Sequence, residues 1–128
     1  MIRLILAVTY LFLFLILGIP VLLAEWLIGK RNPGLKARSS KAVVSWGFRC
    51  IAVFTGTKVI VRGRENIPID TAALFVGNHR SYFDIVLTCP VFPNVTGYVA
   101  KAEMRKWPLL SSWMRNIHCL FLDRDNIK

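Results

Sequence analysis

A run of 21 residues without a charged side chain, residues 4–24, constrains this chain more than any other feature. An α-helix rises 1.5 Å per residue, so a helix of this length covers about 30 Å, the thickness of the hydrocarbon core of a bilayer. A cleaved signal peptide has a shorter apolar region, of about 7 to 15 residues. Here the chain continues through Trp26 and Leu27 into Lys30 and Arg31. These features favour an uncleaved membrane anchor.

Gly18 and Pro20 lie inside the apolar run. Proline has no N–H to donate to the preceding helical turn, so a kink is expected here. A straight helix would cross the bilayer, whereas a kinked one can re-enter on the same side. The sequence leaves both possibilities open.

A second helix is expected after the break at residues 32–34, which are Asn, Pro and Gly. Arg38, Lys41, Ser45 and Arg49 recur at helical spacing, and apolar residues cover the other faces. This pattern is typical of a helix at a membrane interface, although a soluble helix with a solvated charged stripe is an alternative. We therefore interpret residues 1–56 as a helical pair embedded in, or lying on, one membrane face.

The distribution of charge supports an anionic membrane surface as a partner. Lys and Arg number 17 against 7 Asp and Glu, a net charge of +10, and residues 30–57 contain six bases and no acid. A basic block directly after an apolar block is typical of anionic lipid binding. Nucleic-acid binding is disfavoured, because the bases are not interleaved with aromatic residues on a soluble face. The positive-inside rule places residues 30–49 in the cytoplasm.

Length and cysteine content limit the architecture further. A chain of 128 residues holds at most one compact core. Cys50, Cys89 and Cys119 are odd in number and form no C-x-x-C pair, which indicates neither a disulfide framework nor a zinc ribbon. Three free cysteines suit the reducing cytoplasm.

Short β-branched or apolar runs predict strands at residues 57–62, 71–76, 97–100 and 119–122. Helical spacing predicts helices over residues 81–88 and 108–117, with Pro108 as the first helical residue of the second. Strands that alternate with helices imply βαβ units, in which ligands bind beyond the carboxyl ends of the strands. The predicted fold class is α/β: a membrane-associated two-helix motif followed, over residues 57–128, by a partial αβα sheet domain.

The most informative motif is His79-x-x-x-x-Asp84, placed between a predicted strand and a predicted helix. His79 at a strand end would face a cleft, and Asp84 in the first helical turn would hydrogen-bond the far ring nitrogen and stabilise an imidazolium. His79 would then be a general base for a substrate hydroxyl that attacks an acyl thioester. The alternative is structural, because Ser81 and Asp84 have the spacing of a capping box.

Two bases lie at other predicted strand ends. Lys101 ends the third strand and Arg124 ends the fourth, so both would project over the same edge as His79 and could hold a phosphate. Taken singly, each could instead be a solvated surface base. Arg124 also lies between Asp123 and Asp125, where it could form only a local ion cluster.

A metal centre is the competing arrangement for the same region. It would draw on His79, Asp84, His118, Cys119 and Asp123. Adjacent residues on a strand point to opposite faces, so His118 and Cys119 would be poor joint ligands. A metal site is therefore not expected.

Residues 78–84 (NHRSYFD), 98–104 (YVAKAEM), 108–110 (PLL) and 119–124 (CLFLDR) closely resemble the 1-acyl-sn-glycerol-3-phosphate acyltransferases of bacterial phospholipid synthesis. The resemblance extends over nearly the whole chain. It implies transfer of a fatty acyl group from acyl-CoA or acyl carrier protein to the sn-2 hydroxyl of lysophosphatidic acid. It also implies a location on the cytoplasmic face of the bacterial inner membrane, with membrane lipids as partners and no metal or organic cofactor.

The resemblance assigns roles by position. His79 is implied as the general base and Asp84 as the residue that orients it. The substrate-binding positions are implied to be Asn78, Ser81, Lys101 and Arg124, with Lys101 and Arg124 near the glycerol phosphate.

The family also carries a Glu-Gly-Thr-Arg-like block and often a proline-containing block further along, and these 128 residues contain neither. We therefore expect this sequence to be the amino-terminal half of an enzyme, with little or no activity by itself. Two alternatives stay open. One is a non-catalytic module or inactive gene fragment that binds anionic membranes, and the other is an acyltransferase acting on another glycerolipid acceptor.

Overall fold

The computed structural model describes residues 1–69, 71–78 and 81–123. Three long helices come first: α1 (Ile2–Leu17), α2 (Ile19–Arg31) and α3 (Pro33–Thr55). The shorter elements follow in the order η1 (Arg64–Asn66), α4 (Tyr82–Thr88), β1 (Val99–Lys101), η2 (Ala102–Lys106), α5 (Leu110–Asn116) and β2 (Leu120–Leu122). The described chain is therefore mostly helical.

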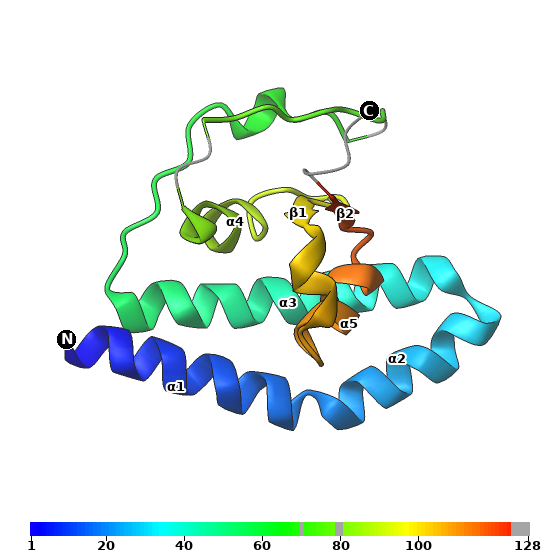
Figure 1. Ribbon diagram of the computed structural model, residues 1–128. Coiled ribbons are helices and arrows are strands. Elements are labelled where there is room, and N and C mark those ends of the chain that lie inside the picture. The colour runs from blue at the N-terminus through cyan, green and yellow to red at the C-terminus, as the bar shows by residue number, and fades with distance from the viewer. Residues whose placement is uncertain (70, 79–80, 124–128) are drawn as a thin grey trace.

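The elements stack in three layers (Figure 1). α1 and α2 form a bent arm along one side of α3, α4 and the strands lie on its other side, and α5 overlaps the middle of α3 in this view, with contacts between α3 and each of these helices. The core is a cluster of Val44, Cys89, Trp113 and Ile117, against which Phe14 of α1 also packs. The same core thus draws on the amino-terminal helices and on the region that follows them.

The kink expected near Gly18 and Pro20 is confirmed. α1 ends at Gly18, Pro20 lies in the first turn of α2, and the two helices are bent by 47°. Taken singly, none of the described helices is both long enough and apolar enough to cross a bilayer, although α1 and α2 reach that length and composition together.

The expected second helix is confirmed as α3, which begins after the predicted break. The Asn32 side chain accepts a hydrogen bond from the Leu35 N–H at 2.9 Å, and Pro33 occupies the first turn, where its missing N–H costs no bond. The prediction that the stripe of Arg38, Lys41, Ser45 and Arg49 lies at the surface is wrong for two of its members, however. Arg38 and Arg49 are exposed, but Lys41 and Ser45 are buried, because this part of α3 packs against α4.

The parallel βαβ unit is confirmed over residues 99–122. β1 and β2 pair in parallel, with Val99 opposite Leu120 and Lys101 opposite Leu122, and they are the two strands of the described sheet. The predicted strands at 57–62 and 71–76 are wrong for the described chain, in which both segments are unpaired. A strand needs a neighbour for its backbone hydrogen bonds, and the described residues supply none there.

The start of α5 also differs from the prediction. Pro108 does not begin the helix; Leu109 is the residue before the first turn, and its φ of 62° is in the left-handed region. That backbone conformation interrupts the helical path between Pro108 and Leu110. The predicted helix over 81–88 is confirmed as α4, beginning one residue later.

Candidate active site

The capping box at the start of α4 is present in the structure. The Ser81 N–H donates to Asp84 Oδ2 at 2.9 Å, and the Phe83 N–H donates to Ser81 Oγ at 3.1 Å. These bonds satisfy backbone donors that the first helical turn leaves without partners. Asp84 thus has the structural role that the spacing allowed. A carboxylate has two oxygens and about four acceptor positions, so this cap is compatible with a second bond to an imidazole.

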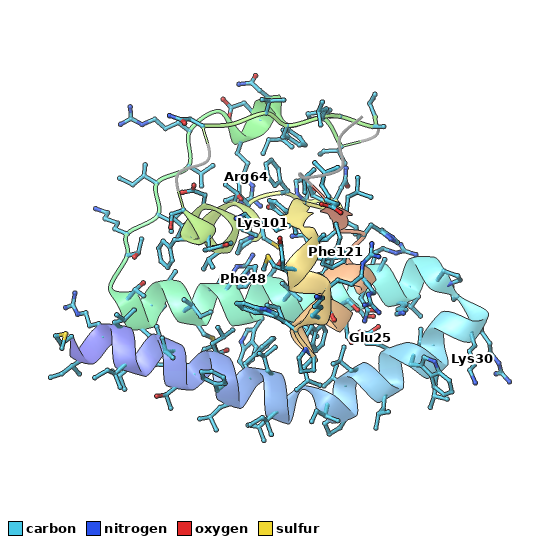
Figure 2. All side chains as sticks on the ribbon, viewed as in Figure 1. Glu25, Lys30, Phe48, Arg64, Lys101 and Phe121 are labelled. Carbon is cyan, nitrogen blue, oxygen red and sulfur yellow. The ribbon has the colours of Figure 1, made fainter. Side chains whose placement is uncertain are left out.

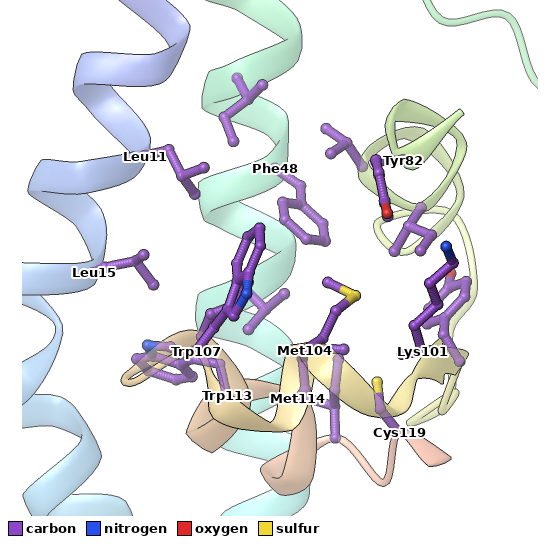
Figure 3. Close-up of a pocket in the computed structure, with 18 of the residues that line it drawn as sticks. Leu11, Leu15, Phe48, Tyr82, Lys101, Met104, Trp107, Trp113, Met114 and Cys119 are labelled. Atoms are coloured by element: carbon purple, nitrogen blue, oxygen red, sulfur yellow. The ribbon is translucent and has the colours of Figure 1, made fainter. Parts of the chain in front are cut away.

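Beside this cap lies an apolar cavity of about 750 Å³. Its walls come from α1, α3, α4, β1, η2 and α5, and most of the side chains are aliphatic, aromatic or sulfur-containing. Figure 3 shows Tyr82 and Lys101 together on one side, Leu11 and Leu15 of α1 on the other, and Phe48 and Met104 between them. The cavity wall is therefore mostly apolar, with polar groups at one end.

The structure brings together some of the predicted site residues. Ser81 and Lys101 line the same cavity, Lys101 as the last residue of β1, and Asp84 is bonded to Ser81. Asn78 is exposed and is not part of the cavity wall. His79 and Arg124 lie outside the described residues, so their roles stay predictions.

Burial favours the neutral forms of two groups in the cavity wall, the Tyr98 phenol and the Cys119 thiol. Burial raises the pKa of the Tyr98 phenol to about 12, against an opposing effect of its hydrogen bond with Thr88. Burial also raises the pKa of the Cys119 thiol. Because desolvation disfavours the charged form of both groups, this wall suits an uncharged chain.

The competing metal site gains no support from the described residues. In that part of the chain, no three His, Cys, Asp or Glu side chains are grouped closely enough to hold an ion. His118 and Cys119 lie outside β2, and His118 has a φ of 62°, so the expected alternation of their side chains along a strand does not apply.

Sequence reasoning missed the cavity itself. Its inner wall combines Phe48 of α3, Met104 of η2 and Trp113 of α5, which are far apart in the sequence. The helical spacing that predicted a helix over residues 108–117 was a partial signal, since Leu110, Trp113 and Ile117 of that segment line the cavity. Periodicity identifies a buried face but not an empty space in front of it.

Known proteins with similar sequences are acyltransferases. A family described as Acyltransferase matches residues 58–128. A 1-acyl-sn-glycerol-3-phosphate acyltransferase of Neisseria meningitidis is 29% identical over 111 residues, which cover 81% of this chain and 42% of the relative. A probable enzyme of the same name from Mycoplasma pneumoniae is 31% identical over 88 residues, covering 63% of this chain and 33% of the relative.

Lysophosphatidylcholine acyltransferase 1 of Rattus norvegicus is 35% identical over 69 residues, which cover 54% of this chain and 12% of that protein. No solved structure matches. The chain thus spans less than half the length of these relatives, and distant homology to two named kinds of acyltransferase covers part of it. Because the family match includes more than half of its residues, this chain belongs to the acyltransferase family.

Proposed function

We propose that the complete protein transfers a fatty acyl group from acyl-CoA or acyl carrier protein to the sn-2 hydroxyl of lysophosphatidic acid. The observation that carries the proposal is the apolar cavity of about 750 Å³ with Ser81 and Lys101 in its wall. Pockets of about 300 to 1,000 Å³ enclose organic ligands of moderate size, so the cavity has room for much of an acyl chain. The acceptor is taken from the relatives named as 1-acyl-sn-glycerol-3-phosphate acyltransferases.

In the proposed reaction, His79 removes the proton from the acceptor hydroxyl as that oxygen attacks the thioester carbonyl carbon. Collapse of the tetrahedral intermediate breaks the C–S bond, and the imidazolium returns the proton to the leaving thiolate. Asp84 orients the ring and stabilises its positive charge. The atoms balance without a metal or an organic cofactor.

The charged groups would bind the acceptor at one end of the cavity, and the acyl chain would occupy the other. Lys101 lies at the polar end of the cavity, where its ammonium would attract the acceptor phosphate. Arg124 would add a bidentate contact to the same phosphate. The acyl group would extend away from them, toward the apolar side chains of α1.

We also propose that the α1–α2 arm binds the cytoplasmic face of the membrane. Large apolar side chains crowd its outer surface, and patches of this kind mark interaction sites (Figure 2). The most exposed side chains of the two helices are Ile2, Leu4, Ile5, Phe12, Ile16, Leu17, Leu23, Trp26 and Leu27. Lys30 and Arg31 end the arm, with the Lys30 amine 3.6 Å from the centroid of the Trp26 ring. An aromatic ring beside basic residues is typical of a membrane interface.

The decisive experiment is His79→Ala in the complete protein, assayed for acyl transfer to lysophosphatidic acid. Loss of a general base should lower kcat by about a hundredfold or more. The matched control is His118→Asn, because the chain has two histidines and asparagine tolerates the positive φ at His118. Activity of His79→Ala within about tenfold of wild type would remove His79 from the proposed role.

The acceptor is tested with the same protein. Turnover should be highest on lysophosphatidic acid and lower on glycerol 3-phosphate and lysophosphatidylcholine. A preference for lysophosphatidylcholine, the acceptor in the name of the rat relative, would contradict the proposed acceptor while leaving acyl transfer intact. Binding to anionic vesicles without transfer to any acceptor would favour a non-catalytic membrane module instead.

A further inference from the structure

A basic side chain lies buried between α3 and α4. Lys41, near the middle of α3, is only 7% exposed, whereas Arg38 and Arg49 of the same helix lie in solvent. Burial lowers the pKa of the Lys41 amine, and the neighbouring Cys89 thiol opposes that change. Removing an ammonium from water is costly unless it gains hydrogen-bond partners, so the buried Lys41 amine requires such partners.

Those contacts lie at the carboxyl end of α4. Lys41 Nζ donates to Ser45 Oγ at 2.9 Å and to the backbone carbonyl of Cys89. Cys89 is completely buried and directly follows the last residue of α4, and its N–H donates to the Ile85 carbonyl. Carbonyls at the end of a helix lack intrahelical partners and form its partially negative end. Lys41 therefore places a donor where α4 presents an acceptor.

α4 depends on such contacts because it is short. Its seven residues span about 10 Å, and isolated helices of that length are unstable in water. A second tie near the same end joins the Thr88 hydroxyl to the Tyr98 hydroxyl at 3.0 Å. The opposite end carries the Ser81–Asp84 capping box. A change of tilt at the carboxyl end of α4 thus moves Asp84.

We propose that Lys41 is a positioning residue for acyl transfer. By holding the carboxyl end of α4 against α3, it sets the direction in which α4 presents Asp84 to the general base, His79. The inference rests on the proposed function, in which Asp84 orients the general base. It identifies a role for a residue of α3, outside the matched family region of residues 58–128.

The test is Lys41→Met in the complete protein, since methionine is similar in length but has no donor. We expect kcat to fall by about tenfold to a hundredfold, because displacement of a catalytic group by about 1 Å has effects of that size. The KM for each substrate should stay within about twofold, because the altered geometry affects the reacting group more than substrate binding. Amide hydrogen exchange at Phe83 and Asp84 should accelerate, because α4 loses one of its ties.

The matched control is Glu25→Leu. Ser39 Oγ donates to Glu25 Oε2 at 2.8 Å, so this change removes a buried polar link between α3 and α2, away from α4 (Figure 2). It should alter the melting temperature while leaving kcat and the exchange rates in α4 at wild-type values. Equal losses of kcat in both variants, or normal kcat in Lys41→Met, would overturn the proposal.

Two further comparisons keep the test decisive. If Lys41→Met does not fold, Ser45→Ala removes one of the Lys41 partners with a smaller change in volume, and it should show the same effects to a lesser degree. Wild-type kcat and exchange in that variant would count against the proposal. If the wild-type protein transfers no acyl group, the proposed function fails, while the exchange rates in α4 still show whether Lys41 holds that helix.

Discussion

The hydroxyl of Tyr98 links the sheet to α4 through its hydrogen bond with Thr88 Oγ1. Burial raises the pKa of this phenol to about 12, above the value of about 10 in an unfolded chain. The folded state therefore holds the proton more tightly. The contribution of the protonated Tyr98 phenol to the free energy of unfolding is complete below about pH 10 and is lost as the pH rises through about 12.

We accordingly expect Tyr98→Phe to lower the free energy of unfolding by about 0.5 to 1.5 kcal/mol at neutral pH. The difference from wild type should shrink between pH 10 and pH 12, where the wild-type contribution is lost. Denaturant unfolding at several pH values measures both effects. Tyr82→Phe is the control, because that ring is 66% exposed. A difference between Tyr98→Phe and wild type that grows with pH would contradict this assignment.

At the level of single residues, the sequence identified candidates but not their surroundings. The spacing of Ser81 and Asp84 predicted both a cap and an orienting carboxylate, and the structure confirms the cap. Lys41 and Ser45 share one helical stripe with Arg38 and Arg49, but only the tertiary packing of α4 decides which members are buried. Periodicity along one helix carries no information on the element that will cover it.

The contact between α1 and α3 depends on Gly47. A Cβ at this position would lie 2.7 Å and 2.9 Å from ring atoms of Phe14. That ring is held by aromatic neighbours, with its centroid 5.9 Å from that of Trp113 and 6.4 Å from that of Trp46. The glycine therefore allows the two helices to approach closely.

Gly47→Ala tests which of two opposing effects is larger. Alanine favours the helix by about 1 kcal/mol over glycine, whereas overpacking costs about 1 to 3 kcal/mol. We expect net destabilisation, observed as a lower melting temperature in detergent. Gly34→Ala is the matched control, because its nearest neighbour would lie at an ordinary 3.6 Å, and it should be neutral or stabilising. A higher melting temperature for Gly47→Ala would show that Phe14 moves aside without cost.

Helices and strands differed in how well the sequence predicted them. α3 and α4 begin at Asn32 and Ser81, whose capping side chains are local signals that tertiary structure did not override. The β-branched run at residues 57–62 predicted a strand but is unpaired in the described chain. Strand formation requires a pairing partner, often one distant in sequence, and composition alone does not supply it.

Across the whole molecule, the bent arm belongs to the core as well as to the outer surface. Phe14, Leu15 and Leu22 pack against the buried cluster that contains Trp113. The large side chains on the other faces of α1 and α2 remain exposed. The predicted boundary between residues 1–56 and 57–128 remains a prediction, but the packing makes the arm one wall of the cavity rather than a detached anchor.

The proposed membrane binding of the arm predicts how the molecule is oriented on a bilayer. Trp26 of α2 is 56% exposed, and Leu74 is also exposed; Leu74 belongs to residues 71–78, a segment that lies on the far side of α3 from the arm (Figure 1). The test uses two variants, each with a single tryptophan. In the first, Trp46, Trp107 and Trp113 are replaced by Phe, so that Trp26 remains. In the second, all four tryptophans are replaced by Phe and Leu74→Trp is added. On anionic vesicles with brominated acyl chains, Trp26 fluorescence should be strongly quenched, because an interfacial helix inserts its apolar face about 5 to 10 Å into the bilayer. The Leu74→Trp variant should keep its fluorescence, and equal quenching of both would show that the arm does not direct membrane binding.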